Sequence, residues 1–199
     1  MLPDDEQADL DLVAAFLVGK GLSPEPFSRE EMQTGRTPDF RVRRDGEIVA
    51  YCEVKSPNDP WLDNKLRAAP AEVIVGGARP DPTFNRLARL LSKADSQFLA
   101  VNPSQIQYNI LAYVNHDKMS RYSDLVETLT GYFHTSDGAR ISTLRHIAED
   151  RIGEAKRRID ACLWFEGKDL KGVVVNDADL DRTSRFCRLL AFDQANIKC

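Results

Sequence analysis

The sequence predicts an α/β fold with a mixed central β-sheet flanked by helices. Three segments support this prediction. Residues 37–56 alternate in the manner of a β-hairpin, residues 81–98 carry an amphipathic helical pattern, and residues 109–115 form a continuous apolar run typical of a buried strand. A strand, a helix and a second strand in this order indicate a β-α-β crossover, which places parallel strands in the sheet.

The composition is ordinary for one globular α/β domain. The 199 residues are 42% hydrophobic and 29% charged. No apolar run approaches the length of a membrane span, so no membrane contact is expected. The net charge of −4 means that any nucleic-acid contact must come from a local basic patch. The acidic N-terminus lacks the basic start of a signal peptide and the cysteines form no C-x-x-C pair, which is typical of a cytoplasmic protein with free thiols.

The first 36 residues are expected to hold a helix and a segment of ambiguous type. Residues 4–21 carry an apolar stripe at helical spacing, acidic residues in the first turn and glycines at the end. Glu6 lies one turn before Leu10, on the same face of the helix as this apolar stripe. Its carboxylate either points inward or only stabilises the N-terminus of the helix. Residues 22–36 fit either a short helix, opened by a capping box at Ser28–Glu31, or a strand.

Residues 37–56 form the predicted hairpin. Arg44-Asp45-Gly46 is interpreted as a three-residue turn, with glycine at the position that needs a positive φ. This turn would set Phe40 opposite Ala50 and Val42 opposite Ile48. One face is then apolar, and a one-residue slip would expose it to water. The apolar face comprises Phe40, Val42, Ile48, Ala50, Cys52 and Val54, while Asp39, Glu53 and Lys55 lie on the opposite face.

An irregular segment separates the hairpin from the predicted crossover helix. Residues 56–82 are rich in proline and glycine and are expected to be a loop beside the end of the hairpin. Trp61 can stack on a base or pack beneath its own loop. Asp81 is predicted to cap the following helix, with Pro82 at its first position. Lys93 and Gln97 lie one turn apart on that helix.

The C-terminal part continues the alternation of helices and strands. The helix expected at 143–158 bears the strongest basic surface of the chain, including Arg157 and Arg158, and this surface fits either a phosphate backbone or a salt-bridged solvent face. His116-Asp117 is interpreted as polar surface. The further elements that we expect are helices at 122–131 and 181–192 and strands at 161–165 and 172–175.

Two carboxylates and an ammonium group converge at one end of the predicted hairpin. Mg²⁺ is typically held by one or two carboxylates while it keeps water and phosphate oxygens as further ligands. Asp39 and Glu53 can supply this pair, and Lys55 can orient an attacking water and stabilise developing negative charge. The pattern therefore predicts metal-dependent cleavage of phosphodiesters. A surface hairpin with solvated Glu53 and Lys55 is the alternative.

These residues resemble the motif of the PD-(D/E)XK nuclease superfamily, which has the restriction-endonuclease-like fold. Pro38-Asp39 corresponds to the PD half, and Glu53-Val54-Lys55 corresponds to the ExK half. In that family the two acidic residues bind the metal and the lysine is catalytic. The resemblance covers about residues 4–115, the core of a single expected domain at 1–199, with residues 116–199 as a C-terminal α/β extension.

The resemblance implies a nuclease that uses Mg²⁺ or Mn²⁺, with DNA as the expected substrate, and it allows a homodimer. Family members often place an acidic residue on the first helix near the metal, which would be Glu6, and a lysine or glutamine on the helix after the ExK strand, which makes Gln97 a catalytic candidate. A catalytically inactive nuclease-fold module that binds nucleic acid or a protein partner is the alternative function. The candidates for nucleic-acid contact are Lys93, Trp61, Arg157 and Arg158.

Overall fold

The computed structural model describes residues 3–70, 77, 81–135 and 137–192. Its centre is a six-stranded sheet with the strand order β1-β2-β3-β4-β7-β8. The two pairings at the middle of the sheet, β3 with β4 and β4 with β7, are parallel, and the other pairings are antiparallel. The predicted mixed sheet is therefore confirmed. The strands are β1 (Ser23–Pro26), β2 (Phe40–Arg44), β3 (Glu47–Lys55), β4 (Tyr108–Asn115), β7 (Ala161–Glu166) and β8 (Asp169–Val175).

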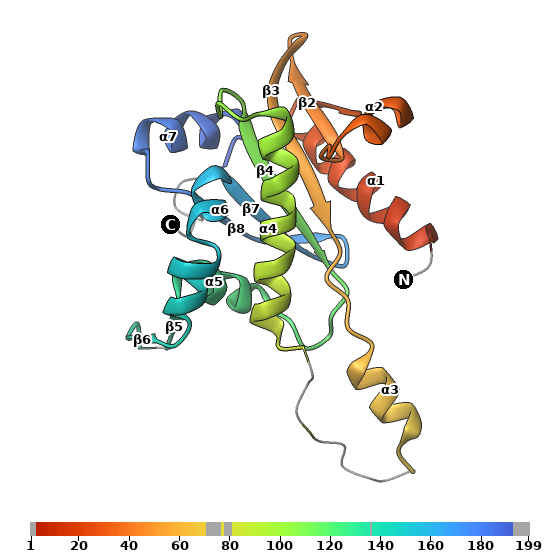
Figure 1. Cartoon of the computed structure of the whole chain (residues 1–199), viewed down its shortest axis with the longest axis vertical. Coiled ribbons are helices and arrows are strands. Elements are labelled where there is room, and N and C mark those ends of the chain that lie inside the picture. The colour runs from red at the N-terminus through yellow and green to blue at the C-terminus, as the bar shows by residue number, and fades with distance from the viewer. Residues whose placement is uncertain (1–2, 71–76, 78–80, 136, 193–199) are drawn as a thin grey trace.

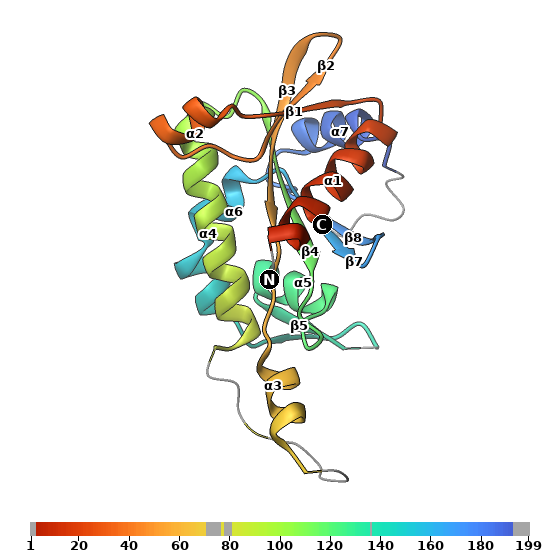
Figure 2. The same cartoon turned by 90° about the vertical axis from the view of Figure 1, so that its right-hand side faces the viewer.

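Helices cover both faces of the sheet (Figures 1 and 2). One face packs against α1 (Pro3–Gly19) and α7 (Leu180–Leu189), which contribute buried side chains such as Val13, Leu17 and Phe186. The helices over the other face are α4 (Thr83–Val101), α5 (Tyr122–Thr130), the π-helix η1 (His146–Arg151) and α6 (Gly153–Arg158). Because α4 joins the parallel strands β3 and β4, the predicted β-α-β crossover is present.

The hairpin of β2 and β3 differs from its predicted register. The turn has two residues, Asp45 and Gly46, with φ values of 52° and 86°, which is the conformation that matches the twist of the flanking strands. Phe40 pairs with Cys52 rather than with Ala50. A β-bulge at Val49 adds one residue to β3 and restores the alternation of faces beyond it.

The bulge explains which predicted faces are right. Phe40, Val42, Ala50, Cys52 and Val54 are buried together on the α1 side, as expected. Ile48 lies before the bulge and packs instead toward the α4 side, so its predicted face was wrong. A two-residue turn alone would have mixed the faces, and the bulge is the local adjustment that prevents this.

Other expectations need correction. Residues 22–36 contain both proposed structures, since β1 is followed by α2 (Arg29–Thr34), which Ser28 and Glu31 open with a capping box. The segment 56–82 is not only a loop, because it contains α3 (Trp61–Ala68). α4 begins at Thr83 with Pro82 as its N-cap, one residue later than expected. The predicted helix at 143–158 is interrupted at Ile152 and divides into η1 and α6.

The remaining elements form a small addition to the main sheet. β5 (Tyr132–His134) and β6 (Arg140–Ser142) pair as a separate two-stranded sheet that the sequence patterns did not reveal. Within the described ranges, no helix is both long enough and apolar enough to cross a lipid bilayer.

Candidate metal centre

Asp39 and Glu53 come from the two paired strands and meet on the side of the sheet that α4 covers. Asp39 directly precedes β2, and the pairing of Phe40 with Cys52 brings it beside Glu53 in β3. The Asp39 Oδ2 atom accepts a hydrogen bond of 2.7 Å from the backbone N–H of Val54. Glu53 is buried, with only 1% of its surface exposed. The two carboxylates that the motif predicts are therefore neighbours in space.

Lys55 and Gln97 complete this cluster. The Lys55 ammonium donates hydrogen bonds to Glu53 Oε1 and, at 3.2 Å, to Gln97 Oε1. The Gln97 side-chain amide donates at 2.8 Å to the carbonyl of Thr37, two residues before Asp39. Gln97 thus connects α4 both to the lysine and to the backbone that leads into β2. The structure brings together Asp39, Glu53, Lys55 and Gln97, which the sequence had singled out from separate segments.

The environment of the carboxylates favours their protonated forms. Burial raises the pKa of Glu53 to about 7, the nearby Asp39 carboxylate adds to this rise, and the Lys55 ammonium opposes it. Burial also raises the pKa of Asp39, against the opposing effects of the Val54 N–H and of Lys55. Two adjacent carboxylates with raised pKa values are typical of a functional site, because a further cation is needed to stabilise both charges.

The donor set fits a hard divalent cation. Glu53 Oε2 is buried and has no hydrogen-bond partner in the described part of the chain, and such an orphaned oxygen requires an explanation. No group of three or more His, Cys, Asp or Glu side chains suited to a metal is found among the described residues. Mg²⁺ does not need one, since it binds through one or two carboxylates and fills its other positions with water and phosphate oxygens.

Glu6 lies at the margin of this cluster. Its side chain is exposed on α1, but its charge is close enough to contribute to the raised pKa of Asp39. The structure therefore places Glu6 within electrostatic reach of the two carboxylates without joining it to them as a third ligand.

A second polar network adjoins the site on the α1 side and was missed from the sequence. Asp9 is buried in α1, with 4% of its surface exposed, and it accepts a hydrogen bond from the Ser56 hydroxyl. His116 Nε2 lies 2.8 Å from Asp9 Oδ2. Since Ser56 directly follows Lys55 and His116 directly follows β4, Asp9 fastens α1 to the ends of both strands. The sequence did contain a signal for the burial of Asp9. It is spaced by four residues from Val13 and by eight from Leu17, which places all three on one face of the helix.

The interpretation of His116-Asp117 as polar surface is therefore wrong, because both side chains pair with buried residues of other elements. The Asp117 side chain is 1% exposed and its Oδ2 accepts a hydrogen bond of 2.6 Å from Arg86. The imidazole of His116 remains about one third exposed, with 37% of the side chain accessible. The two residues point their side chains to different partners, one on α1 and the other on α4.

The residues predicted to contact nucleic acid lie in three different places. Lys93 is exposed on α4. Trp61 begins α3 and is half-buried, and a Cβ on Gly77 would lie 3.7 Å from its ring. Arg158 pairs with Asp95, with 2.6 Å between Nε and Oδ1. Asp95 and Gln97 point about 200° apart on the α4 helix, so α4 separates Arg158 from the carboxylate cluster.

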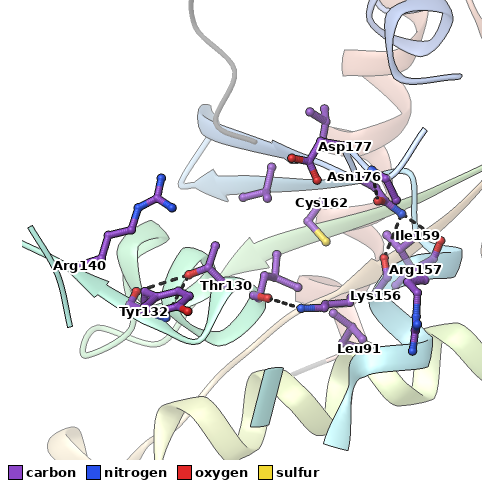
Figure 3. A pocket seen from close by; sticks show the side chains of 14 residues that line it. Leu91, Thr130, Tyr132, Arg140, Lys156, Arg157, Ile159, Cys162, Asn176 and Asp177 are labelled. Atoms are coloured by element: carbon purple, nitrogen blue, oxygen red, sulfur yellow. Dashed lines mark hydrogen bonds between the residues drawn. The ribbon is translucent and has the colours of Figure 1, made fainter. Parts of the chain in front are cut away.

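Arg157 lines a cavity of about 340 Å³ on this other side of α4 (Figure 3). Lys156 reaches across it and donates at 3.0 Å to the Leu129 carbonyl in the last turn of α5, while Asn176 donates to the carbonyls of Lys156 and Arg157. These contacts supply hydrogen-bond donors to backbone carbonyls in the last turns of α5 and α6, which have no partner within their own helix. They give the polar groups of the cavity a structural role, and they do not connect the cavity to Asp39 and Glu53.

No family model matches the sequence, and comparisons with curated proteins and with solved structures gave no match.

Proposed function

We propose that the chain is a Mg²⁺-dependent nuclease of restriction-endonuclease-like fold that hydrolyses phosphodiester bonds, with DNA as its substrate. The observation that carries this proposal is the convergence of Asp39, Glu53 and Lys55 on two paired strands, with Glu53 buried and one of its oxygens without a partner among the described residues. A solvated surface hairpin would leave these side chains exposed to water, whereas here they are held together beneath α4.

The carboxylates are suited to hold the metal. Glu53 would use Oε2, because Oε1 already accepts from Lys55. Asp39 would use Oδ1, because Oδ2 accepts from the Val54 N–H. A bound Mg²⁺ or Mn²⁺ supplies a water of lowered pKa and neutralises charge on the phosphate. The contact with Val54 fixes the Asp39 carboxylate, so that Oδ1 is oriented before any ligand arrives.

Lys55 provides the positive charge for the reaction. An ammonium group has three N–H donors, and two of them are used by Glu53 and Gln97. The third can orient the attacking water or contact a phosphate oxygen on which negative charge develops. Gln97 acts as a positioning residue, because it holds Lys55 while its own amide is fixed by the Thr37 carbonyl.

Cleavage assays with site variants test this proposal. Wild type should convert supercoiled plasmid or labelled linear DNA to shorter products with Mg²⁺ or Mn²⁺ and should be inactive with EDTA. Asp39→Asn and Lys55→Ala should each lower the rate by about 10²-fold or more, in line with the loss of one charge-stabilising group. Single-stranded DNA and RNA of the same sequence would define the substrate class.

The matched control is Asp45→Asn. It makes the same chemical change at the exposed turn of the same hairpin, where asparagine tolerates the positive φ of 52°, and it should leave the cleavage rate unchanged. Titration of Mn²⁺ by calorimetry should show binding in wild type that is lost in Asp39→Asn. Retained cleavage in both site variants would overturn the proposal. Absence of Mn²⁺ binding, even with DNA present, would favour a non-catalytic binding module.

A further inference from the structure

A cavity of about 340 Å³ lies where α5 and α6 meet the strands β7 and β8 (Figure 3). Much of its lining is apolar. Cys162 of β7 and Val174 of β8 line it from the sheet, while Leu91 of α4, Leu129 of α5 and Ile159 after α6 line it from the helices. Small-molecule sites in proteins are typically cavities of about 300–1,000 Å³ with an apolar lining and a few polar groups. This cavity has the size and the lining of such a site.

The two-stranded sheet of β5 and β6 stands at the mouth of this cavity. Tyr132 begins β5 and Arg140 begins β6, and both residues line the cavity. They lie across it from α6 (Figure 3). All three residues of β6 are exposed, so this strand contributes little to the hydrophobic core. Its place at the mouth shapes the entrance to the cavity instead.

Lys156 carries a positive charge into this largely apolar space. Its side chain extends into the cavity, and its ammonium donates a hydrogen bond of 3.0 Å to the Leu129 carbonyl (Figure 3). This contact uses one of the three N–H donors of an ammonium group. Within the described part of the chain, Lys156 forms no ion pair. The carboxylate of Glu149, one helix earlier, is paired with Arg145.

The charge of Lys156 is therefore only partly compensated. Burial lowers the pKa of this ammonium, and the negative charges of Glu149 and Asp177 oppose that effect without forming an ion pair with it. An anion bound in the cavity would supply the missing counter-charge. A hydrogen bond between two charged groups in surroundings of low polarity is stronger than one between neutral groups.

The positions of the other charged residues indicate the charge of the ligand. The guanidinium of Arg157 points away from the cavity, and its Nε donates at 2.9 Å to the Gly153 carbonyl of its own helix (Figure 3). Arg140 is exposed at the mouth, and Asp177 also lines the cavity. Lys156 is thus the cation that reaches the apolar interior, while Asp177 disfavours a second negative charge. This arrangement matches a monoanion better than a phosphate dianion.

We propose that this cavity binds a small carboxylic acid with an apolar body. The carboxylate accepts hydrogen bonds from the two remaining N–H donors of Lys156, and the body packs against Leu91, Leu129 and Val174. This inference goes beyond the proposed nuclease function and does not depend on it, because the cavity shares no lining residue with the candidate metal centre.

Three probes with the same body and different head groups test the proposal on the wild-type chain. They are phenylpropionate, phenylpropanol and phenylpropylamine, and ligand-observed NMR titration at neutral pH and low salt measures their binding. The carboxylate should bind with a Kd of about 1 mM, as is typical of so small a ligand. It should bind at least about tenfold more tightly than the alcohol or the amine, because it alone pairs with the ammonium. Equal affinities for the three probes, or no binding of the carboxylate, would overturn the proposal.

Variants of Lys156 locate the binding. Lys156→Met keeps the apolar stem without the ammonium and should weaken carboxylate binding about tenfold, which corresponds to about 1.4 kcal/mol. Lys156→Arg keeps the charge and should retain most of the affinity. Lys168→Met makes the same change at an exposed position in the β7–β8 turn and should match wild type. Wild-type affinity for the carboxylate in a folded Lys156→Met protein would overturn the proposal. If circular dichroism shows that this variant does not fold, the comparison of head groups on wild type decides alone.

Discussion

Replacing Glu53 by glutamine should stabilise the metal-free protein at alkaline pH, although it removes half of the candidate metal centre. In the folded protein, the pKa of Glu53 is about 7, above its ordinary value of 4.5. A carboxyl group with a raised folded pKa makes the folded state lose stability as the pH rises from about 4.5 through 7. Glutamine does not titrate, so the Glu53→Gln protein avoids this loss.

The expected size follows from the two pKa values. At 1.36 kcal/mol per pKa unit, the difference between 4.5 and about 7 corresponds to about 3 kcal/mol at pH 8. At pH 5 the same calculation gives less than about 1 kcal/mol. Screening by solvent is small because the Glu53 side chain is only 2% exposed. The advantage of Glu53→Gln should therefore grow by about 2.5 kcal/mol between pH 5 and pH 8.

The assay is urea unfolding in EDTA from pH 5 to pH 8, followed by the fluorescence of the fully buried Trp164. Glu47→Gln, at the exposed first residue of the same strand, is the control and should not change the pH dependence. Addition of Mn²⁺ at pH 8 should stabilise wild type much more than Glu53→Gln. A free-energy difference that is the same at pH 5 and pH 8, or a less stable Glu53→Gln protein at pH 8, would refute this reasoning.

Three further predictions concern other parts of the structure. Mn²⁺ affinity should rise about tenfold between pH 6 and pH 8 in calorimetric titrations, because a Glu53 pKa of about 7 makes the ionised fraction rise from about 9% to about 91%. Gly172→Ala should lower the free energy of unfolding by about 1–3 kcal/mol, because a Cβ there would lie 2.3 Å from the Tyr122 ring. Arg86→Met should destabilise the protein by about 3–5 kcal/mol, as urea unfolding would measure, since it removes the buried guanidinium that pairs with Asp117 and Asp59.

The two predictions on stability each have a matched control variant, and the prediction on Mn²⁺ affinity has a contrary outcome. Gly19→Ala meets no atom within 4 Å of the new Cβ, so a loss of stability as large as that of Gly172→Ala would contradict the steric explanation. Arg89→Met removes an exposed arginine whose ion pair with a described residue is with Asp81, and it should cost less than about 1 kcal/mol. Mn²⁺ affinity that does not change with pH would mean that Glu53 is not a ligand.

The sequence alone determined the local features of this protein. The alternation of apolar residues in β2 and β3 assigned Phe40, Ala50 and Cys52 to one face, and the carboxylates of Asp39 and Glu53 to the other. The candidacy of Gln97 came instead from the family resemblance, which often places a lysine or glutamine on the helix after the ExK strand, and its catalytic role stays a prediction. The face assignments succeed because side-chain direction follows from strand periodicity.

Tertiary structure decided the features that depend on distant partners. The bulge at Val49 sets the register of the hairpin, and no residue type at that point of the sequence predicts a bulge. Asp9 meets Ser56 across 47 residues and His116 across 107. Arg86 joins Asp59, Asp81 and Asp117, and thereby fixes where α3 stands. A polar side chain in a sequence has many possible partners, and packing of the helices against the sheet selects one of them, because a buried charge is tolerated only where a partner is already in place.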